Sequence, residues 1–310
     1  MSPDLGHTLS SISSILPKVD AVSLHFAPYS FHPKGLSIRT LIKLAVILAK
    51  KTLHITFHEI WIGAFPKAPW RERLIGGLQR KSIQRFLQIA KPKAVYSTNA
   101  ASIDRLRKAG IAPKYLYLFG NINTQCKTIN KSADECIKKP IVTFFGTPYL
   151  NFPYSQLIEN LVELFKSLRA EPIIRILGAV REGSGLSLLR EEAKHYALPV
   201  EETGRLSTED LAIEFQAAAC GVSTTPFDAL GKSSSTAAML EHGLPVVAHD
   251  DGDTPQEVLF APGPFKERIV LLEQTDFVNR LIKLIKAPKP QFFDGAAYTA
   301  DSFISFLSSK

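Results

Sequence analysis

Short apolar runs alternate with longer amphipathic stretches along most of this chain, beginning at Val19. Apolar runs of this length are typical of buried strands, and helical periodicity between them is typical of the crossovers in a parallel sheet. The pattern occurs twice, and a polar segment without periodicity, residues 121–140, separates the two series. The sequence therefore predicts two sequential α/β domains with parallel sheets.

Domain boundaries follow from this pattern. We predict an N-terminal domain over residues 1–120, a linker over 121–140, a C-terminal domain over 141–288 and a final segment over 289–310. The final segment holds a helix over 297–307, which we expect to return to the N-terminal domain. Two domains in sequence imply a cleft at their interface, which is a common place for a ligand.

The N-terminal series contains about four strands. Residues 1–17 hold too little sequence for a strand and helix unit before the first of them. We predict strands over 20–26, 52–58, 94–98 and 114–119, and helices over 36–50, 71–90 and 101–110.

Two histidines and a carboxylate fall where these strands end. His25 closes the first predicted strand, and His58 with Glu59 closes the second. Ligands of parallel sheets lie at the carboxyl ends of strands, so these side chains are candidates to line the cleft. A histidine satisfied inside the core is the equally good alternative.

The C-terminal series is longer and equally regular. Ser207 begins a helix as its N-cap, with Asp210 three residues later in its first turn. We predict strands over 141–145, 172–177, 200–203, 220–225, 245–249 and 268–272, and helices over 154–168, 185–196, 211–218, 233–242 and 275–285.

One helix start in this series has the features of an anion site. Gly231 and Lys232 precede three serines, Ser233, Ser234 and Ser235, and then Thr236. Free backbone N–H groups, the positive end of a helix dipole and a mobile cation together favour phosphate. The alternative is a serine N-cap beside a solvated lysine. The segment is not a P-loop, because the required glycine four residues before Gly231 is absent.

Charge is distributed unevenly along the chain. Residues 1–139 carry 22 Lys and Arg against 7 Asp and Glu, whereas the remainder carries 15 against 22. A basic half indicates an anionic partner, either nucleic acid or anionic lipid. The basic amphipathic helix over 71–90 either lies on such a membrane or packs on a sheet with its charges in solvent. No RNA-binding motif or aromatic platform accompanies the charge, which disfavours nucleic acid.

Other features indicate a soluble cytoplasmic protein without a metal. No apolar run is long enough to span a bilayer, and residues 1–16 do not resemble a signal peptide. Cys126, Cys136 and Cys220 cannot all pair and have no metal-binding spacing. His54 and His58 lie on a predicted strand, about 13 Å apart, so zinc is not expected.

The order of these pieces resembles the GT-B glycosyltransferases, in particular the retaining group 1, or family 4, enzymes. The resemblance covers most of the chain and is strongest over residues 141–257. It is carried by the His-Glu strand end, a strand ending in Gly146, a Leu-Gly strand end, the Gly-x-Leu-Ser-Thr-Glu-Asp-Leu helix start, a strand ending in Thr-Thr-Pro, and Glu-His-Gly-Leu-Pro-Val-Val.

The resemblance implies two Rossmann-like domains facing a cleft, with a nucleotide-sugar donor on the C-terminal domain and the acceptor on the N-terminal domain. It implies that Gly231 to Thr236 hold the donor diphosphate, that Gly204 and Arg205 lie near the base, and that His58 lines the cleft near the sugar. It also implies a donor contact from Glu257. Gly146 and Thr147 occupy the turn after the first strand of the C-terminal domain.

Three departures from the family pattern are visible. The Arg and Lys that usually follow the first strand of the C-terminal domain are absent, because Gly146 is followed by Thr147, Pro148 and Tyr149. Ala238 stands where a carboxylate is usual. The family's first strand and glycine-rich loop have no equivalent, so the N-terminal domain is expected to be incomplete. Lys232 is then the candidate cation for the leaving diphosphate, in a reaction that needs no metal or cofactor.

The sequence thus favours a cytoplasmic glycosyltransferase, peripheral on the inner face of the membrane, that moves a sugar from a nucleotide-sugar to an acceptor such as a lipid-linked sugar or polysaccharide precursor. His58 and Lys232 are the candidate catalytic residues. A catalytically degenerate nucleotide-sugar-binding paralogue and a nucleic-acid-binding protein are the alternatives.

Overall fold

The computed structural model describes residues 5–64, 68–122, 139–181, 183–250 and 263–308. These residues form two compact units, one over Met1–Leu116 and one over Tyr117–Lys310. Each unit has its own parallel sheet and its own apolar core. Most of the predicted linker, residues 123–138, lies outside the described residues.

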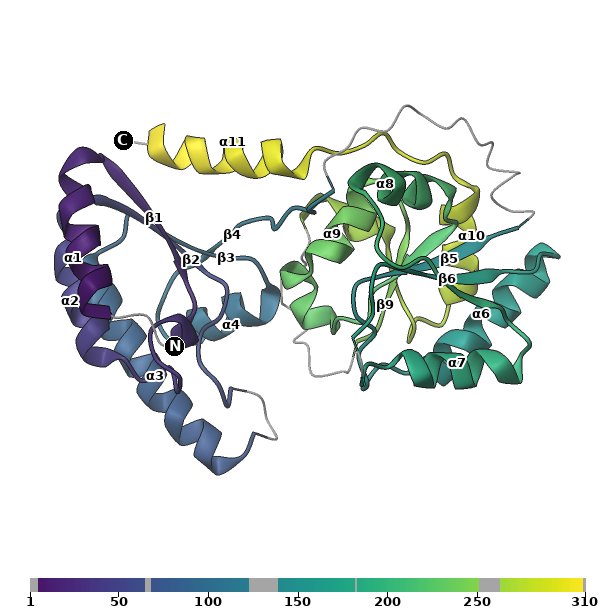
Figure 1. Ribbon diagram of the computed structural model, residues 1–310, viewed down its shortest axis with the longest axis horizontal. Coiled ribbons are helices and arrows are strands. Elements are labelled where there is room, and N and C mark those ends of the chain that lie inside the picture. Colours follow the sequence, from purple (N-terminus) through teal and green to yellow (C-terminus); the bar gives the residue numbers. More distant parts are fainter. Residues whose placement is uncertain (1–4, 65–67, 123–138, 182, 251–262, 309–310) are drawn as a thin grey trace. The chain divides into compact units, whose positions relative to one another are not determined.

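The first unit contains a four-stranded parallel sheet in the order β1-β2-β3-β4. Its strands are the four that the sequence predicts, although each is shorter by one to four residues. They are β1 (Ala21–Phe26), β2 (Thr52–Phe57), β3 (Ala94–Ser97) and β4 (Lys114–Tyr115), and the helices are α1 (Leu5–Ile15), α2 (Ile38–Leu48), α3 (Trp70–Ala90) and α4 (Ala100–Lys108) (Figure 1).

Helix α1 was not predicted, because serines dilute its apolar pattern. Leu9, Ile12 and Leu16 nevertheless recur at helical spacing and pack against the core of the first unit. That core joins strand residues such as Phe26 and Phe57 to apolar residues of α2, α3 and α4. Tertiary burial therefore stabilises a segment whose local composition is weakly helical.

The second unit contains a six-stranded parallel sheet in the order β10-β9-β8-β5-β6-β7. Its strands are β5 (Ile141–Phe145), β6 (Ile173–Leu177), β7 (Val200–Glu202), β8 (Cys220–Val222), β9 (Val246–Ala248) and β10 (Ile269–Leu271). Its helices are α6 (Tyr154–Leu168), α7 (Leu186–His195), α8 (Thr208–Ala217), α9 (Ser234–Glu241), α10 (Phe277–Lys286) and α11 (Gly295–Ser308), and a 3-10 helix covers Phe227–Lys232. The predicted elements of this series are all present, with boundaries within two residues except at the start of α8 and the end of β8, which each differ by three.

Helices cover both faces of the second sheet, with α6 and α7 on one side and α8 and α9 on the other (Figure 1). The core on the α6 side includes residues of α7 and α10. The predicted cap of α8 is confirmed, because the Ser207 hydroxyl accepts a hydrogen bond from the Asp210 N–H at 3.0 Å.

The strand order of the second sheet determines where a ligand can bind. From β5 the chain moves outward to β6 and β7, then returns to place β8 on the other side of β5. The crossovers to these two neighbours leave a crevice outside the carboxyl ends of β5 and β8. A ligand of a doubly wound sheet is expected there.

Candidate functional site

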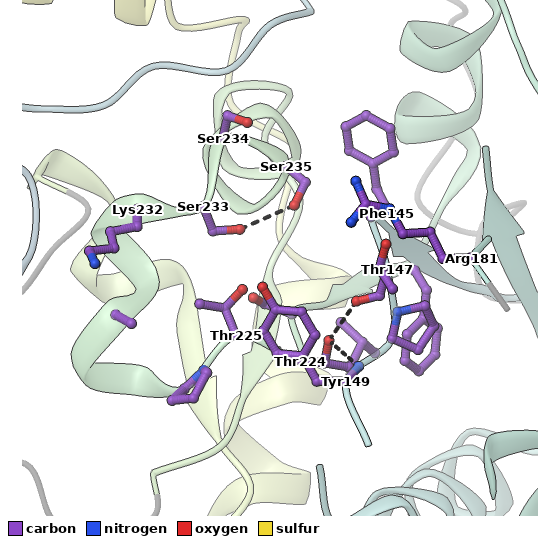
Figure 2. Close-up of a pocket in the computed structure, with 17 residues that line it drawn as sticks. Phe145, Thr147, Tyr149, Arg181, Thr224, Thr225, Lys232, Ser233, Ser234 and Ser235 are labelled. Atoms are coloured by element: carbon purple, nitrogen blue, oxygen red, sulfur yellow. Dashed lines mark hydrogen bonds between the residues drawn. The ribbon is translucent and has the colours of Figure 1, made fainter. Parts of the chain in front are cut away.

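A pocket of about 460 Å³ lies at this reversal point of the second sheet. Its volume is in the range of small-molecule sites. It is lined by the end of β5 with the loop after it, the end of β8 with the loop after it, and the start of α9 (Figure 2). The lining residues are Phe144 to Tyr149, Arg181, Val222 to Pro226, Ala229 and Lys232 to Ser235.

A glycine allows the loop after β5 to approach the start of α9 closely. Gly146 has a φ of +104°, and a Cβ at this position would lie 3.0 Å from the Ser235 Oγ atom. The loop is also held to the end of β8, because the Thr224 hydroxyl accepts from the Tyr149 N–H at 3.1 Å and donates to the Thr147 carbonyl at 3.3 Å. These contacts fix the pocket's rim.

The start of α9 is a compact cluster of hydroxyl groups. Ser233 is the N-cap, and its Oγ accepts from the Thr236 N–H at 3.2 Å. Its Oγ also lies 3.1 Å from the Ser235 Oγ, and the Thr236 hydroxyl joins the network through Ser223 at 2.7 Å. The cluster orients hydroxyl groups and helix N–H groups toward one small volume, which suits an anion.

Two cations flank these hydroxyls. Figure 2 shows Lys232 and Arg181 on opposite sides of the pocket, with Thr225, Ser233 and Ser235 between them. The Lys232 side chain is exposed and extends away from the serines, and no described residue holds its ammonium group. A free lysine side chain on four rotatable bonds can turn toward an anion at low energetic cost. No lining residue among those described is acidic, so the pocket is electropositive.

The structure gathers six of the predicted site residues in this pocket: Gly146, Thr147, Lys232, Ser233, Ser234 and Ser235. Gly231 and Thr236 are buried directly beside it and do not line it. Thr236 positions the lining residues through its hydroxyl contacts with Ser223 and Ser233.

Gly204 and Arg205 lie apart from the pocket's lining. They follow β7, which is separated from β5 by β6, and Gly204 forms an isolated antiparallel bridge with Gly178. Arg205 is exposed. Their predicted place near the base stays a prediction, as does the role of Glu257, which lies outside the described residues.

His58 and Glu59 belong to the first unit, at the carboxyl edge of its sheet. His25 and His58 end adjacent parallel strands, and the His25 Nδ1 and His58 Nε2 atoms lie 2.8 Å apart. Their rings stack with centroids 5.1 Å apart, and both side chains are open to solvent to some degree. These two are therefore not core histidines. His54 is the core histidine of this strand, and burial lowers its pKa to about 4, with a smaller contribution from His25.

Sequence reasoning missed the other eleven lining residues, and Tyr149, Arg181, Thr224 and Thr225 are among them. Arg181 adds a second cation to the lining of the pocket. The signal in the sequence was partial: Arg181 follows a predicted strand, so it lies at the carboxyl edge of the sheet, but its nearness to the pocket depends on the strand order. The described residues contain no group of three side chains placed to bind a metal ion.

Replacing Gly146 by alanine is expected to destabilise the second unit. The φ of +104° is unfavourable for a residue with a Cβ, and that Cβ would press on Ser235. We expect a loss of about 1–3 kcal/mol in the free energy of unfolding, measured by urea denaturation. Gly77→Ala is the matched control, because Gly77 is helical with open space around it, so alanine should stabilise by about 0.5–1 kcal/mol. A Gly146→Ala variant as stable as wild type would contradict this account of the rim.

Comparison with solved structures identifies the fold. The chain is similar to the Anabaena protein HepE in complex with UDP, with 15% identity and a TM-score of 0.55 over 99% of this chain and 84% of that one. It is also similar to the α,α-trehalose 6-phosphate synthase of Burkholderia multivorans, with 10% identity and a TM-score of 0.58 over 98% and 74%. A Listeria monocytogenes structure assigned as a UDP-N-acetylglucosamine 2-epimerase matches with 14% identity and a TM-score of 0.50 over 98% and 78%.

The chain has the GT-B fold of these structures. No protein-family model and no curated protein sequence matches it. At these identities the likeness establishes the fold, and the chemistry has to be argued from the pocket.

Proposed function

We propose that this protein is a glycosyltransferase that moves a sugar from a nucleotide-sugar donor to an acceptor. The observation that carries the proposal is the pocket at the reversal of strand order, where a serine-rich helix start lies between Lys232 and Arg181. Its hydroxyl groups, N–H groups and cations suit a diphosphate. Its volume of about 460 Å³ leaves room for more than a single phosphate group.

The proposed chemistry follows from where charge develops. When the bond between the sugar and the diphosphate breaks, negative charge accumulates on the leaving diphosphate oxygen. Donors already in place at the start of α9, and a cation that reaches the same oxygen, stabilise this charge most in the transition state. Lys232 is assigned that role, and Arg181 is assigned to binding the donor from the opposite side.

The donor is proposed to be linked to uridine diphosphate, because HepE was solved with UDP and the Listeria structure is assigned to a UDP-sugar enzyme. We expect UDP to raise the Tm more than GDP or ADP. At a ligand concentration 100 times Kd, the stabilisation is about 2.7 kcal/mol. A thermal-shift titration with the three nucleotides measures it.

The control for that titration is UMP, which lacks the second phosphate and should stabilise the protein less. Arg181→Gln should weaken the shift with UDP, whereas Lys194→Gln, an exposed cation on α7, should leave it unchanged. Equal shifts with all three diphosphates would overturn the choice of base. The absence of any shift would count against a donor site in this pocket.

The acceptor is proposed to be a lipid-linked sugar or polysaccharide precursor, used by a cytoplasmic protein that associates peripherally with the inner face of the membrane. The first unit supports this, because residues 1–116 carry 18 Lys and Arg against 5 Asp and Glu. No helix among the described residues has the length and apolarity needed to cross a bilayer. His58, beside His25, is proposed to contact the sugar.

We propose that the transfer retains the anomeric configuration of the sugar, because the sequence resembles the retaining family 4 enzymes. We also propose that the transfer uses no metal or resident cofactor. NMR of the product assigns the anomer, and activity measured with and without EDTA tests the metal.

A catalytically degenerate paralogue is the second candidate, and Ala238 is the observation that favours it. Ala238 stands where the resembling enzymes carry a carboxylate, and its side chain is fully buried in α9. In such a protein, UDP and the UDP-sugar would raise the Tm by the same amount. The protein would neither transfer nor hydrolyse the sugar. The shared fold of the Listeria structure adds a third outcome, conversion of the UDP-sugar to its epimer, which the same NMR experiment detects.

A further inference from the structure

Helix α3 has two apolar sides, and only one of them packs against the rest of its unit. On the inner side, Ile83 and Phe86 are buried in the core of the first unit. Gln79 is buried as well; its amide donates to the Lys34 carbonyl and accepts from the Ile62 N–H, both at 3.0 Å. These contacts fix the rotation of the helix about its own axis.

The outer side carries a second apolar stripe. Trp70, Leu74 and Leu78 are spaced four residues apart, which places them on one face of the helix. Their exposed fractions are 70%, 64% and 49%. Large apolar side chains exposed in a row at the surface mark an interaction site more often than isolated ones do.

Basic side chains flank this stripe. Arg71, Arg73, Arg80 and Lys81 are all exposed, and Glu72 is the one acidic residue of α3. Arg71 lies over the Trp70 ring, with its guanidinium carbon 5.5 Å from the ring centroid.

The neighbouring helix carries the same combination of residues. Helix α2 packs beside α3 (Figure 1). It exposes Ile38 and Arg39, and also Lys43 and Val46, which line a shallow groove against α1.

We infer that the outer face of α3 is a docking surface for an anionic membrane. Tryptophan and leucine set among arginine and lysine side chains are the composition of helices that lie in the plane of a lipid interface. The net positive charge of the whole unit complements an anionic leaflet. A nucleic-acid surface is less suited, because Leu74 and Leu78 are aliphatic and cannot stack on bases, and Trp70 is the one exposed aromatic side chain of α3.

This inference gives a location to the membrane association proposed above. Its test measures lipid binding, which needs neither a donor nor turnover. Failure of the docking surface and failure of the glycosyltransferase proposal can therefore be told apart.

The chain supplies its own fluorescent probe. Trp61 and Trp70 are its two tryptophans, so Trp61→Phe leaves Trp70 alone to report on the outer face. With vesicles containing phosphatidylglycerol, we expect the Trp70 emission to shift to shorter wavelength and to be quenched by brominated lipid. With pure phosphatidylcholine vesicles, or with the anionic vesicles at high salt, the shift should be much smaller.

Paired variants separate the apolar from the electrostatic contribution in the otherwise wild-type chain. Leu74→Ser with Leu78→Ser should weaken binding to anionic vesicles about tenfold or more, measured by co-sedimentation. Arg71→Gln with Lys81→Gln should weaken it about 30-fold. The matched controls lie on the second unit, where Leu188→Ser with Ile213→Ser, and Lys166→Gln with Lys194→Gln, should bind as wild type does.

Four results would overturn the inference. The first is an unchanged Trp70 spectrum with anionic vesicles, and the second is equal loss of binding in the control variants. The third is a blue shift that appears without lipid and grows with protein concentration, which would assign the face to a second copy of the chain. The fourth is a larger response to single-stranded nucleic acid than to vesicles, which would assign it to that partner.

Discussion

Lys232→Ala is expected to lower turnover of the nucleotide-sugar by a factor of about 100–1,000 and to change the KM for the donor much less. The ammonium group of Lys232 is the cation nearest in sequence to the hydroxyl cluster of α9, and no described residue holds it in another contact. Removal of a group that stabilises charge developing in a transition state costs about 3–4 kcal/mol in the activation barrier.

The measurement is the initial rate of UDP release. The substrate is the UDP-sugar that raises the Tm of the protein most. When no acceptor is present, this rate reports the slow hydrolysis of the UDP-sugar. Lys232→Arg keeps the charge with a different shape and should recover part of the rate. Arg181→Gln should act mainly on the KM, because Arg181 is assigned to ground-state binding.

Lys194→Ala is the matched control for a lysine on the surface of the same unit. If Lys232→Ala turns over at the wild-type rate, Lys232 has no place in the chemistry. If it loses only donor affinity, it holds the diphosphate without favouring the transition state.

Glu241→Gln is expected to stabilise the protein at pH 8.5 and to leave its stability nearly unchanged at pH 5. Glu241 ends α9 and is fully buried. Its Oε1 atom accepts from the Tyr117 hydroxyl at 2.9 Å and from the Gly120 N–H at 3.0 Å, and its Oε2 atom has no partner among the described residues. Removal from solvent, with a smaller contribution from nearby Asp294, raises the pKa of Glu241 to about 7, and the two hydrogen bonds oppose this rise.

The direction of the pH effect follows from these values. In the unfolded chain the carboxyl ionises near pH 4.5, whereas the folded protein keeps the proton up to about pH 7. Stability is therefore unaffected by this group below pH 4.5, decreases as the pH rises between 4.5 and 7, and stays lower above pH 7. The total loss for wild type is about 3 kcal/mol, because each unit of pKa difference corresponds to about 1.4 kcal/mol. Glutamine keeps an oxygen for Tyr117 and Gly120 and cannot ionise.

Urea denaturation at pH 5 and pH 8.5 measures the difference between variant and wild type at each pH, so other titrating groups cancel. Glu163→Gln, on the exposed side of α6, is the matched control and should give the same difference at both values. A Glu241→Gln variant that is destabilised equally at both values would show that the carboxylate is accommodated in its charged form.

Local sequence predicted the elements of both units closely. Strand β5 and helix α6 have the predicted boundaries, because a short buried strand and an amphipathic helix each carry a strong hydrophobic period. The serine cap of α8 was also readable, since capping depends on residues three apart in sequence. Helix α1 was missed because its stability comes from packing of Leu9 and Ile12, and of Leu16 directly after the helix, in and against the core.

In the candidate site, too, some residues were predictable from the sequence and others were not. The run from Lys232 to Thr236 was identifiable as an anion site, because a helix start with its cap is a local structure. Arg181 was not identified, because it reaches the pocket only through the order β8-β5-β6, and strand order depends on contacts between distant segments.

By itself, the sequence determined the strands, the helices other than α1 and the chemistry of one helix start, since these depend on neighbours within a few residues. The tertiary structure alone decided two further features. It brought Gly146, Arg181 and Lys232 around one pocket, and it left Trp70, Leu74 and Leu78 in solvent while Ile83 and Phe86 were buried. A helix with two apolar sides can bury either of them on a sheet. Which side is buried is set by packing across the whole unit, and no local pattern records it.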